Sequence, residues 1–563
     1  MTEAAEGVMS RWAPGLVTLR GYHRAWLRPD VVAGVVLAAI LVPQGMAYAE
    51  LAGLPPVTGL YTTIACLVAY AIFGPSKVLV LGPDSSVSPL ILAAIVPLVV
   101  TSDPASAITL AGMLAILVGL IEVGLGVARL GFVADLLSSE IRVGYLNGLA
   151  VTIIVGQLPK LFGFSTDANG FINEVKAFFQ GLDGRNIATL ATGIAVLAVL
   201  LILPRITRRI PAVLVAVVGA TVASAVFDLA AHGVATVGVL PQGVPTPALP
   251  FTNWQDVGAL LVGAVGITMV SLTDTIATAS SFAARHGDEV KPDQEMVGVG
   301  LANVAAGFFQ GFAVSVSGSR TAVADQAGAK TQATGLVGAG LVMLLLLAFS
   351  GLLADLPQAA LAAVVISAAL SLMDLGVLRR YATIRPSALV ISLAASGGVI
   401  FFGVLQGIVI AIVLAVLLFF RRNWWPHGAV LGEVPEMGGW HSTKIYPEAQ
   451  QLPGIVVFRW EAPLFFANSG QFRDQVRALV RDREPGWVVL QCEAVTDIDV
   501  TAADMLRDLD EELNAQGAHL AFVELRDRLQ DLVVRYGLHA TLDRDHFYPS
   551  LDEALTDINP PTD

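Results

Sequence analysis

Charged residues are scarce in this chain: Asp, Glu, Lys and Arg together make up 14% of its 563 residues. Apolar residues make up 55%, and the mean hydropathy is +0.70. Helices that cross a bilayer need apolar surface of this kind, whereas a soluble domain of ordinary composition has far less of it. The composition therefore indicates an integral membrane protein surrounded by lipid bilayer.

Cysteine is almost absent, since Cys66 and Cys492 are the only two and lie in very different contexts. This argues against a disulfide framework. A net charge of −13 gives no reason to expect nucleic-acid binding. The sequence also lacks a phosphate-binding P-loop, a Ser-His-Asp set, paired catalytic carboxylates and a metal-ligand cluster. We therefore expect neither an ATP-driven pump nor an enzyme, and no cofactor.

Apolar runs predict about fourteen membrane segments, seven in each half of the region 31–422. Two inverted repeats are expected, at about 31–205 and 211–420, because an odd number of segments per half reverses the orientation of the second half. The predicted segments are 31–48, 58–73, a half-helix after Asp84, 108–127, 141–158, 187–203, 211–227, 257–284, 296–312, a half-helix after Arg320, 336–353, 359–372, 389–402 and 407–420.

Lys and Arg lie on one side of these segments. With a cytoplasmic N-terminal segment (1–30), the Arg205–Arg209 cluster and the cations near 285–291, 379–385 and 421–422 all fall inside. Only the outer loop at 159–185 carries cations against this pattern. The positive-inside rule therefore predicts a multi-pass protein of the inner (plasma) membrane with a cytoplasmic C-terminus.

The character of the chain changes after Arg422. A polar stretch with several glycines, 423–451, is expected to be a linker. From residue 452 to 563 short apolar strands alternate with amphipathic helices, which predicts a small cytoplasmic α/β domain.

Two membrane segments are interrupted by small polar residues. Residues 311–333 read GFAVSVSGSRTAVADQAGAKTQA, and residues 82–89 read GPDSSVSP. Ser and Gly disfavour helix, so each stretch predicts a half-helix that starts inside the membrane. The N-terminus of a half-helix presents free N–H groups and the positive end of a dipole, which suits an anion. The residues predicted to donate hydrogen bonds to the anion are Ser85, Ser86, Ser317, Gly318, Ser319 and Thr321. The alternative is that these small residues only cap the helices and allow neighbouring helices to pack closely.

Two charged residues stand out within these membrane segments. Arg320, at the start of the second half-helix, either adds positive charge to the anion site or forms a structural pair with Asp325 or another acid. Asp274, with Thr278 one turn later, lies mid-span and is the expected ion-coupling residue. It could take a proton or help to hold Na⁺, and the alternative is a structural carboxylate bonded to nearby backbone.

Several motifs resemble the sulfate permease (SulP) family of anion transporters over nearly the whole chain. PQGMAYAELAGLPPVTGLYT (43–62) with GPSK (74–77) looks like the family signature, and SVSGSRTAVADQAGAKTQ (315–332) looks like its tenth membrane segment. PLFFANSGQF (463–472) and VTDIDVTAADML (495–506) look like its C-terminal STAS domain.

The resemblance implies an α-helical polytopic membrane protein with a seven-plus-seven transmembrane inverted repeat, divided into core and gate domains, followed by a small α/β STAS domain. It also implies a homodimer.

The resemblance further implies that Gln44 and Tyr48 line the site, although a Gln in a membrane helix can instead form hydrogen bonds to a neighbouring helix. Thr501 falls where related domains carry a phosphorylatable hydroxyl, with a helix N-cap beside Asp499 as the alternative. Asp274 stands where many members have Glu, and members with Asp include sodium-coupled bicarbonate transporters.

The expected function is secondary active transport of sulfate or a similar small inorganic oxyanion by alternating access, with H⁺ as the expected coupling ion. Alternatives of the same class are Na⁺-coupled bicarbonate symport, dicarboxylate or other anion exchange, and nucleobase transport on the shared fold. An alternative of another class is a membrane-anchored regulatory protein that acts through its STAS-like domain.

Overall fold

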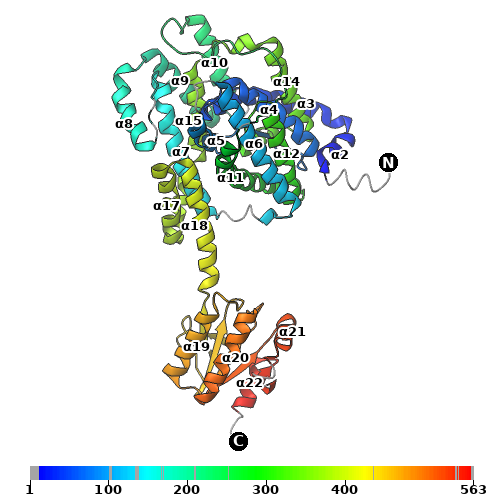
Figure 1. Ribbon diagram of the computed structural model, residues 1–563, viewed down its shortest axis with the longest axis vertical. Helices are drawn as coiled ribbons and strands as arrows, with labels where there is room; N and C mark the ends of the chain where they lie inside the picture. Colours follow the sequence, from blue (N-terminus) through cyan, green and yellow to red (C-terminus); the bar gives the residue numbers. More distant parts are fainter. Residues whose placement is uncertain are drawn as a thin grey trace. The chain divides into compact units, whose positions relative to one another are not determined.

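The computed structural model describes residues 12–99, 104–132, 138–166, 168, 170–207, 211–251, 253–434, 436–538, 542 and 544–559. Arg208, Arg209, the first part of the expected N-terminal segment (1–11) and the last residues (560–563) lie outside them. The chain divides into two compact units, Met1–Ala415 and Val416–Asp563 (Figure 1).

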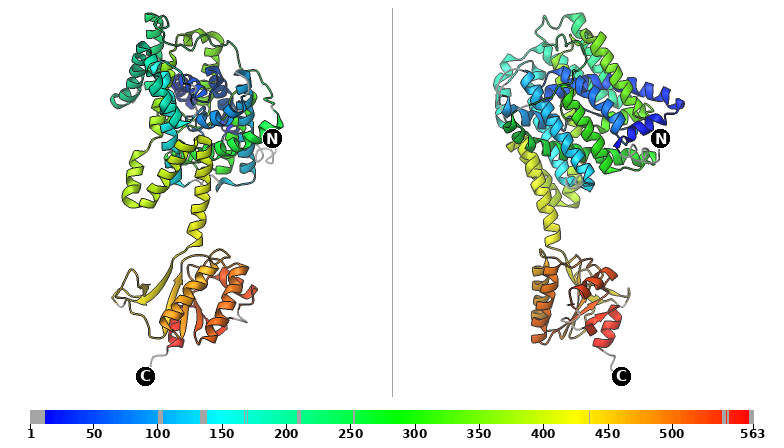
Figure 2. Two further views of the ribbon diagram at one scale, coloured as in Figure 1. Left: turned by 60° about the vertical axis from the view of Figure 1, so that its left-hand side comes forward. Right: turned by 45° about the vertical axis from the view of Figure 1, so that its right-hand side comes forward.

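The first unit is a bundle of apolar helices, seen from two further sides in Figure 2. Among the described residues, seven helices are long and apolar enough to cross a membrane. The helices of the first half are α3 (Leu27–Leu51), α4 (Pro56–Phe73), α5 (Ser88–Ile95), α6 (Pro104–Val127), α7 (Ser139–Phe162), α9 (Ile187–Ile206) and α10 (Ala212–Phe227). Those of the second half are α11 (Trp254–His286), α12 (Pro292–Phe308), α13 (Gly318–Gln326), α14 (Ala333–Ala348), α15 (Gln358–Leu372), α17 (Pro386–Phe402) and α18 (Val404–Trp424), whose residues from Val416 on belong to the second unit. Short helices between or before them are α2 (Pro14–Arg20), α8 (Phe171–Gly181) and α16 (Leu375–Ile384).

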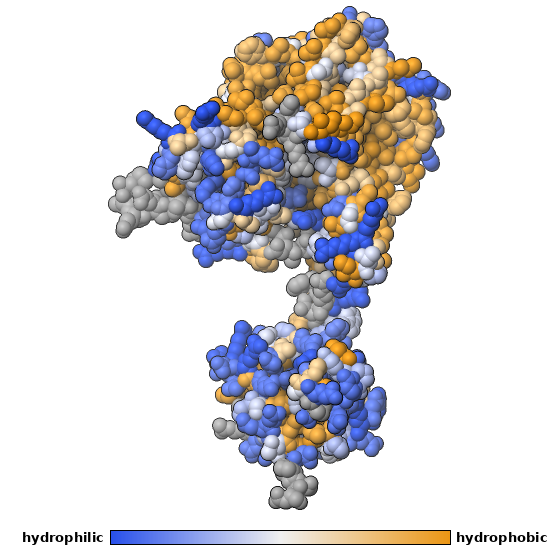
Figure 3. All heavy atoms as spheres, turned by 180° about the vertical axis from the view of Figure 1, so that it is seen from behind, coloured by the Kyte–Doolittle hydropathy of each residue, from blue (hydrophilic) through white to orange (hydrophobic). Residues whose placement is uncertain are grey.

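Apolar side chains remain on the outside of this bundle. On the face shown in Figure 3 they cover a broad continuous area of the first unit, whereas the surface of the second unit is largely hydrophilic. Ile187, Ile206, Val226 and Phe401 are examples, each at least two-thirds exposed. An apolar surface of this extent fits lipid rather than water.

The two halves pack in equivalent pairs. The contact of α3 with α14 corresponds to the contact of α11 with α6. The contact of α7 with α17 corresponds in the same way to that of α15 with α9. The equivalent helices α4 and α12 contact each other. Two short strands, β1 (Leu81–Gly82) and β2 (Ser315–Val316), pair antiparallel just before the two half-helices. In this pattern α10 corresponds to α18, so the division between the halves falls between α10 and α11. The expected division at 205–211 lies one helix too early, because the arginine cluster marks only a loop and helix pairing defines the repeat.

Both interrupted segments are extended and then helical. Ser317 has an extended backbone and precedes α13, which begins at Gly318. In the first half, Asp84 forms a turn before α5: its Oδ1 accepts from Ser86 N at 2.9 Å, and its carbonyl accepts from Ser88 N at 3.0 Å. Pro89, in the first turn of α5, needs no backbone hydrogen bond there. The two predicted half-helices are therefore confirmed, and their N-termini lie on either side of the β1–β2 pair.

The second unit contains a six-stranded sheet of order β4-β3-β5-β6-β7-β8. Strands β5 (Ile455–Trp460), β6 (Trp487–Gln491), β7 (His519–Val523) and β8 (Phe547–Tyr548) are parallel. One apolar core joins the sheet to α19 (Ser469–Arg483), α20 (Val500–Ala515) and α21 (Asp527–Arg535), and a second joins it to α22 (Leu551–Ile558). The predicted small α/β domain is confirmed.

The stretch 423–451, expected as a linker, carries two strands of this sheet. Strand β3 (Gly428–Glu433) pairs antiparallel with β5 and with β4 (Trp440–Ser442). The sheet therefore begins before residue 452. Sequence patterning missed these strands because β3 begins with glycine and has a second glycine near its end, whereas β4 is very short. Both strands are stabilised by pairing with partner strands rather than by their own sequence.

Candidate functional site

A cavity of about 600 Å³ lies inside the first unit. Its walls come from α3, α7, α9, α10, α11 and α15 and from the two interrupted segments. It brings together eight of the residues selected from sequence, from four separate parts of the chain: Gln44, Tyr48, Ser85, Asp274, Thr278, Ser317, Gly318 and Ser319.

The N-terminus of α13 opens directly into this cavity. Gly318 and Ser319 are exposed there, and the Ser317 and Ser319 hydroxyls lie 3.2 Å apart. The first helical hydrogen bond runs from Thr321 N to Ser317 O, so the N–H groups of the three residues before Thr321 have no partner within the helix. This end of α13 can therefore donate hydrogen bonds to an anion.

The N-terminus of α5 is arranged differently. Asp84 accepts hydrogen bonds from the N–H groups of Ser86 and Ser88, so its carboxylate and carbonyl occupy donors that an anion would otherwise use. Ser85 still lines the cavity, whereas Ser86 is 1% exposed. The two half-helices are thus equivalent in fold but unequal as anion donors.

Arg320 and Thr321 lie behind the cavity rather than on its wall, and both are at most 1% exposed. The Thr321 hydroxyl accepts a hydrogen bond from Val80 N at 3.1 Å. The Arg320 guanidinium packs against Gly82, where a Cβ would lie 2.9 Å from Nη1. Its Nη2 is 3.8 Å from Asp84 Oδ2, and among the described residues its three side-chain nitrogens have no hydrogen-bond partner. In this geometry Arg320 supports the turn at Asp84 and does not itself reach the cavity.

Ser86 connects the two carboxylates of the site. Its Oγ lies 2.8 Å from Asp84 Oδ1 and 3.1 Å from Asp274 Oδ2. A hydroxyl group has a single hydrogen, so it can donate to only one of these oxygens. The second contact is favourable only when the carboxyl group on that side carries a proton and donates it.

Arg142 lines the cavity although its sequence context did not predict it as a site residue. It lies in the first turn of α7 and lines the cavity together with Asp274, on which its charge acts. The available signal was its position one residue inside the predicted segment 141–158, since a charge inside a membrane segment usually faces a cavity or a partner.

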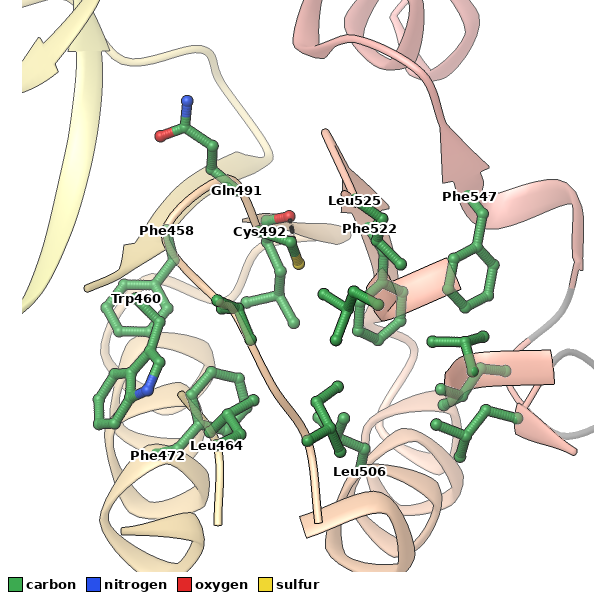
Figure 4. A pocket seen from close by; sticks show the side chains of 17 residues that line it. Phe458, Trp460, Leu464, Phe472, Gln491, Cys492, Leu506, Phe522, Leu525 and Phe547 are labelled. Atoms are coloured by element: carbon green, nitrogen blue, oxygen red, sulfur yellow. Dashed lines mark hydrogen bonds between the residues drawn. The ribbon is translucent and has the colours of Figure 1, made fainter. Parts of the chain in front are cut away.

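The second unit contains a much smaller cavity, drawn in Figure 4, of about 20 Å³. Phe458, Trp460, Phe472 and Phe522 are among the side chains that line it, and the amide group of Gln491 points away from it. It has room for at most about one water molecule and offers no polar partner to hold one, so it is a packing defect rather than a ligand site.

Thr501 is exposed in the first turn of α20. The cap of this helix is Asp499, whose Oδ1 accepts a hydrogen bond from Ala502 N at 2.8 Å. Thr501 is therefore not the N-cap that the alternative interpretation assumed, and its hydroxyl is accessible.

Two sequence families match the chain in adjacent regions. The model described as the sulfate permease family matches residues 27–395, and the STAS domain model matches residues 446–554.

Individual relatives agree with these matches. Probable sulfate transporter MT1781 of Mycobacterium tuberculosis is 42% identical over 547 residues, which cover 97% of each chain. Human solute carrier family 26 member 6 is 32% identical over 504 residues, covering 84% of this chain and 65% of the human protein.

Solved structures share the fold. The structure of the murine Slc26a9 anion transporter, described as inward-facing, superposes with a TM-score of 0.88 at 24% identity, covering 100% of this chain and 96% of that one. The transmembrane domain of the cyanobacterial bicarbonate transporter BicA gives a TM-score of 0.61 at 22% identity, covering 70% of this chain and 98% of that one. At these identities the likeness establishes the fold alone.

Proposed function

The chain belongs to the sulfate permease family of anion transporters and carries a C-terminal STAS domain, and from this premise we propose that it moves sulfate or a similar small oxyanion together with H⁺. The observation that carries the proposal is the single cavity in which the free N-terminus of α13 meets Asp274. Donors for an anion and a carboxylate for the coupling ion then share one space, as symport requires. The substrate is suggested by the relatives named as probable sulfate transporters.

The contacts of Ser86 favour H⁺ over Na⁺ as the coupling ion. Ser86 lies within hydrogen-bonding distance of both Asp84 and Asp274, an arrangement that needs one proton on the carboxyl pair. Protonation would reduce the negative charge that an incoming dianion meets, which couples the two binding events.

The cavity opens toward one end of the bundle. Its lining includes Ser371 and Leu372 at the end of α15, Ser281 and Phe282 near the end of α11, and Val213 at the start of α10. Under the positive-inside rule these ends face the cytoplasm. We therefore assign this conformation to the inward-facing stage of an alternating-access cycle in the inner (plasma) membrane, with the STAS domain in the cytoplasm.

Paired assays in proteoliposomes test this function. Wild type should concentrate labelled sulfate under an inward H⁺ gradient. Asp274→Asn mimics the protonated carboxyl group, so it should still exchange sulfate across the membrane in counterflow but should lose accumulation driven by the gradient. Asp183→Asn, in a short 3-10 helix outside the cavity, is the matched control and should behave as wild type.

Two results would contradict the proposal. Sulfate accumulation by Asp274→Asn under a proton gradient would remove Asp274 from the coupling step. Uptake by wild type that depends on a Na⁺ gradient alone would show that the coupling ion is Na⁺.

A further inference from the structure

The negative charges around the cavity would repel an anion unless a positive charge offsets them. Two carboxylates, Asp84 and Asp274, line it, and among the described residues of its wall Arg142 is the one Lys or Arg. Even with one proton shared by the carboxyl pair, the second carboxylate repels a dianion. The partial charge at the N-terminus of α13 is worth about half an elementary charge and cannot compensate this alone.

The Arg142 guanidinium is available to a ligand. The side chain is half-buried, and within the described part of the chain no hydrogen bond or ion pair engages its guanidinium, although its charge acts on Asp274. Arg320 differs in this respect, because it is 1% exposed, lies behind the wall and has Asp84 as its nearest acid. Of the two arginines, Arg142 is the one that a bound anion can reach.

Arg142 is also held on a rigid support. Two residues further along α7, Gly144 packs so closely on α17 that a Cβ would collide with the backbone of Ser392. The Ser396 hydroxyl donates a hydrogen bond to Gly144 O at 2.7 Å. The first turn of α7 therefore presents the arginine from a backbone position set by tight helix packing.

The arginine and the half-helix end come from different sets of helices. Helix α7 packs on α9, α15 and α17, whereas α13 and β2 pack on α3 and α11. An anion held by both would be contacted from two sides of the cavity. Such a contact would form or break when the two sets move relative to one another.

From this geometry we propose that Arg142 is a substrate-contact residue that selects divalent oxyanions over monovalent ones. The inference rests on the proposed function and names the specificity determinant of the same cavity. The guanidinium presents parallel N–H groups that match two oxygens of a tetrahedral oxyanion. Its Coulomb attraction grows with the charge of the anion, so a dianion gains more than a monoanion.

The test compares Arg142→Gln, Arg142→Lys and Arg379→Gln in proteoliposomes. Arg379 lies on the exposed helix α16, outside the cavity, and serves as the matched control. The measurements are the KM for labelled sulfate and the inhibition constants of unlabelled sulfate and bicarbonate.

We expect Arg142→Gln to raise the sulfate KM at least tenfold while changing bicarbonate inhibition less than threefold. Arg142→Lys should recover part of the loss, because it keeps the charge without the bidentate geometry, and Arg379→Gln should match wild type. This selective shift separates contact with the substrate from a structural role, since misfolding would affect both anions.

An unchanged sulfate KM in Arg142→Gln, or equal shifts for both anions, would overturn the inference and leave the proposed function intact. If wild type carries bicarbonate but no sulfate, the choice of substrate in the proposed function is wrong, and selection of divalent anions is wrong with it.

Discussion

At the scale of single residues, Asp30 shows how a polar side chain can stabilise the interior of this unit. It is completely buried at the start of α3, and its oxygens accept hydrogen bonds from Lys330 N at 2.6 Å and from Thr331 N at 3.1 Å. The hydroxyls of Thr331, Thr334 and Tyr22 donate to it as well. Asp30 therefore ties α3 to the N-terminus of α14, where a negative charge is favoured.

Asp30→Ala should destabilise the protein by about 3 kcal/mol, because it leaves several buried donors without an acceptor. Tyr22→Phe removes one of these hydrogen bonds and should cost about 1 kcal/mol. Thermal unfolding in detergent would rank the two variants. Equal melting temperatures for them would show that Asp30 does not hold α3 to α14.

Cys492 illustrates the effect of burial in the STAS domain. It is 7% exposed, and desolvation, followed by the nearby charge of Glu524, raises the pKa of its thiol to about 12. An unperturbed thiol has a pKa of about 8.5. The pKa of this thiol is higher in the folded than in the unfolded protein. Its contribution to the free energy of unfolding is therefore fully present below about pH 8.5. It is lost as the pH rises toward about 12.

Alkylation by iodoacetamide at pH 8 should therefore modify Cys492 at least a hundredfold more slowly in the folded protein than in the denatured chain, since the thiolate is the reactive form. Peptide mass spectrometry would follow the rate, with the chain in denaturant as the control. Rapid modification of the folded protein would mean that the core around Cys492 opens readily.

At the scale of elements, close packing of helices depends on glycine at specific positions. On α7, Gly144 lies against the backbone of Ser392, whereas at Gly156 the nearest atom to an added Cβ would be 3.7 Å away. The same substitution should therefore act in opposite directions at two positions of one helix.

Gly144→Ala should destabilise by about 1–3 kcal/mol through overpacking against α17. Gly156→Ala should be neutral or stabilise by up to about 1 kcal/mol through higher helix propensity. Melting temperatures of both variants provide the measurement. A stable Gly144→Ala protein would indicate that α7 and α17 can separate without loss, contrary to the rigid support proposed for Arg142.

At the scale of the whole molecule, the distribution of cations predicts its orientation. Val239 is 83% exposed and lies between the predicted segments 211–227 and 257–284, on the side opposite the Arg205–Arg209 cluster. Asp508, on the STAS domain, has a side chain that is 70% exposed. Both native cysteines are buried and should give little background labelling.

A membrane-impermeant maleimide should label Val239→Cys in intact cells. It should label Asp508→Cys only after the membrane is permeabilised. Labelling of Asp508→Cys from outside would reverse the proposed orientation, and with it the assignment of the cavity to the inward-facing stage.

Much of the fold could be predicted from local patterns alone. Hydropathy located the membrane segments, because the free energy of transferring a helix to lipid is the sum of contributions from neighbouring residues in that helix. The serines and glycines of the two interrupted segments predicted the half-helices, because backbone propensity is a property of the residues themselves. Asp274 could be selected for the cost of burying its charge, which depends mainly on its depth in a span.

Only the tertiary structure decided which side chains line the cavity. Successive residues of a helix point in directions about 100° apart, and the packing partner determines which of them faces the interior. Arg320 and Ser86 therefore turned out to lie behind the wall, while Arg142 lies on it. The division between the halves and the strands at 428–442 could not be predicted from the sequence for the same reason. Each depends on packing with a partner element that is distant in the sequence.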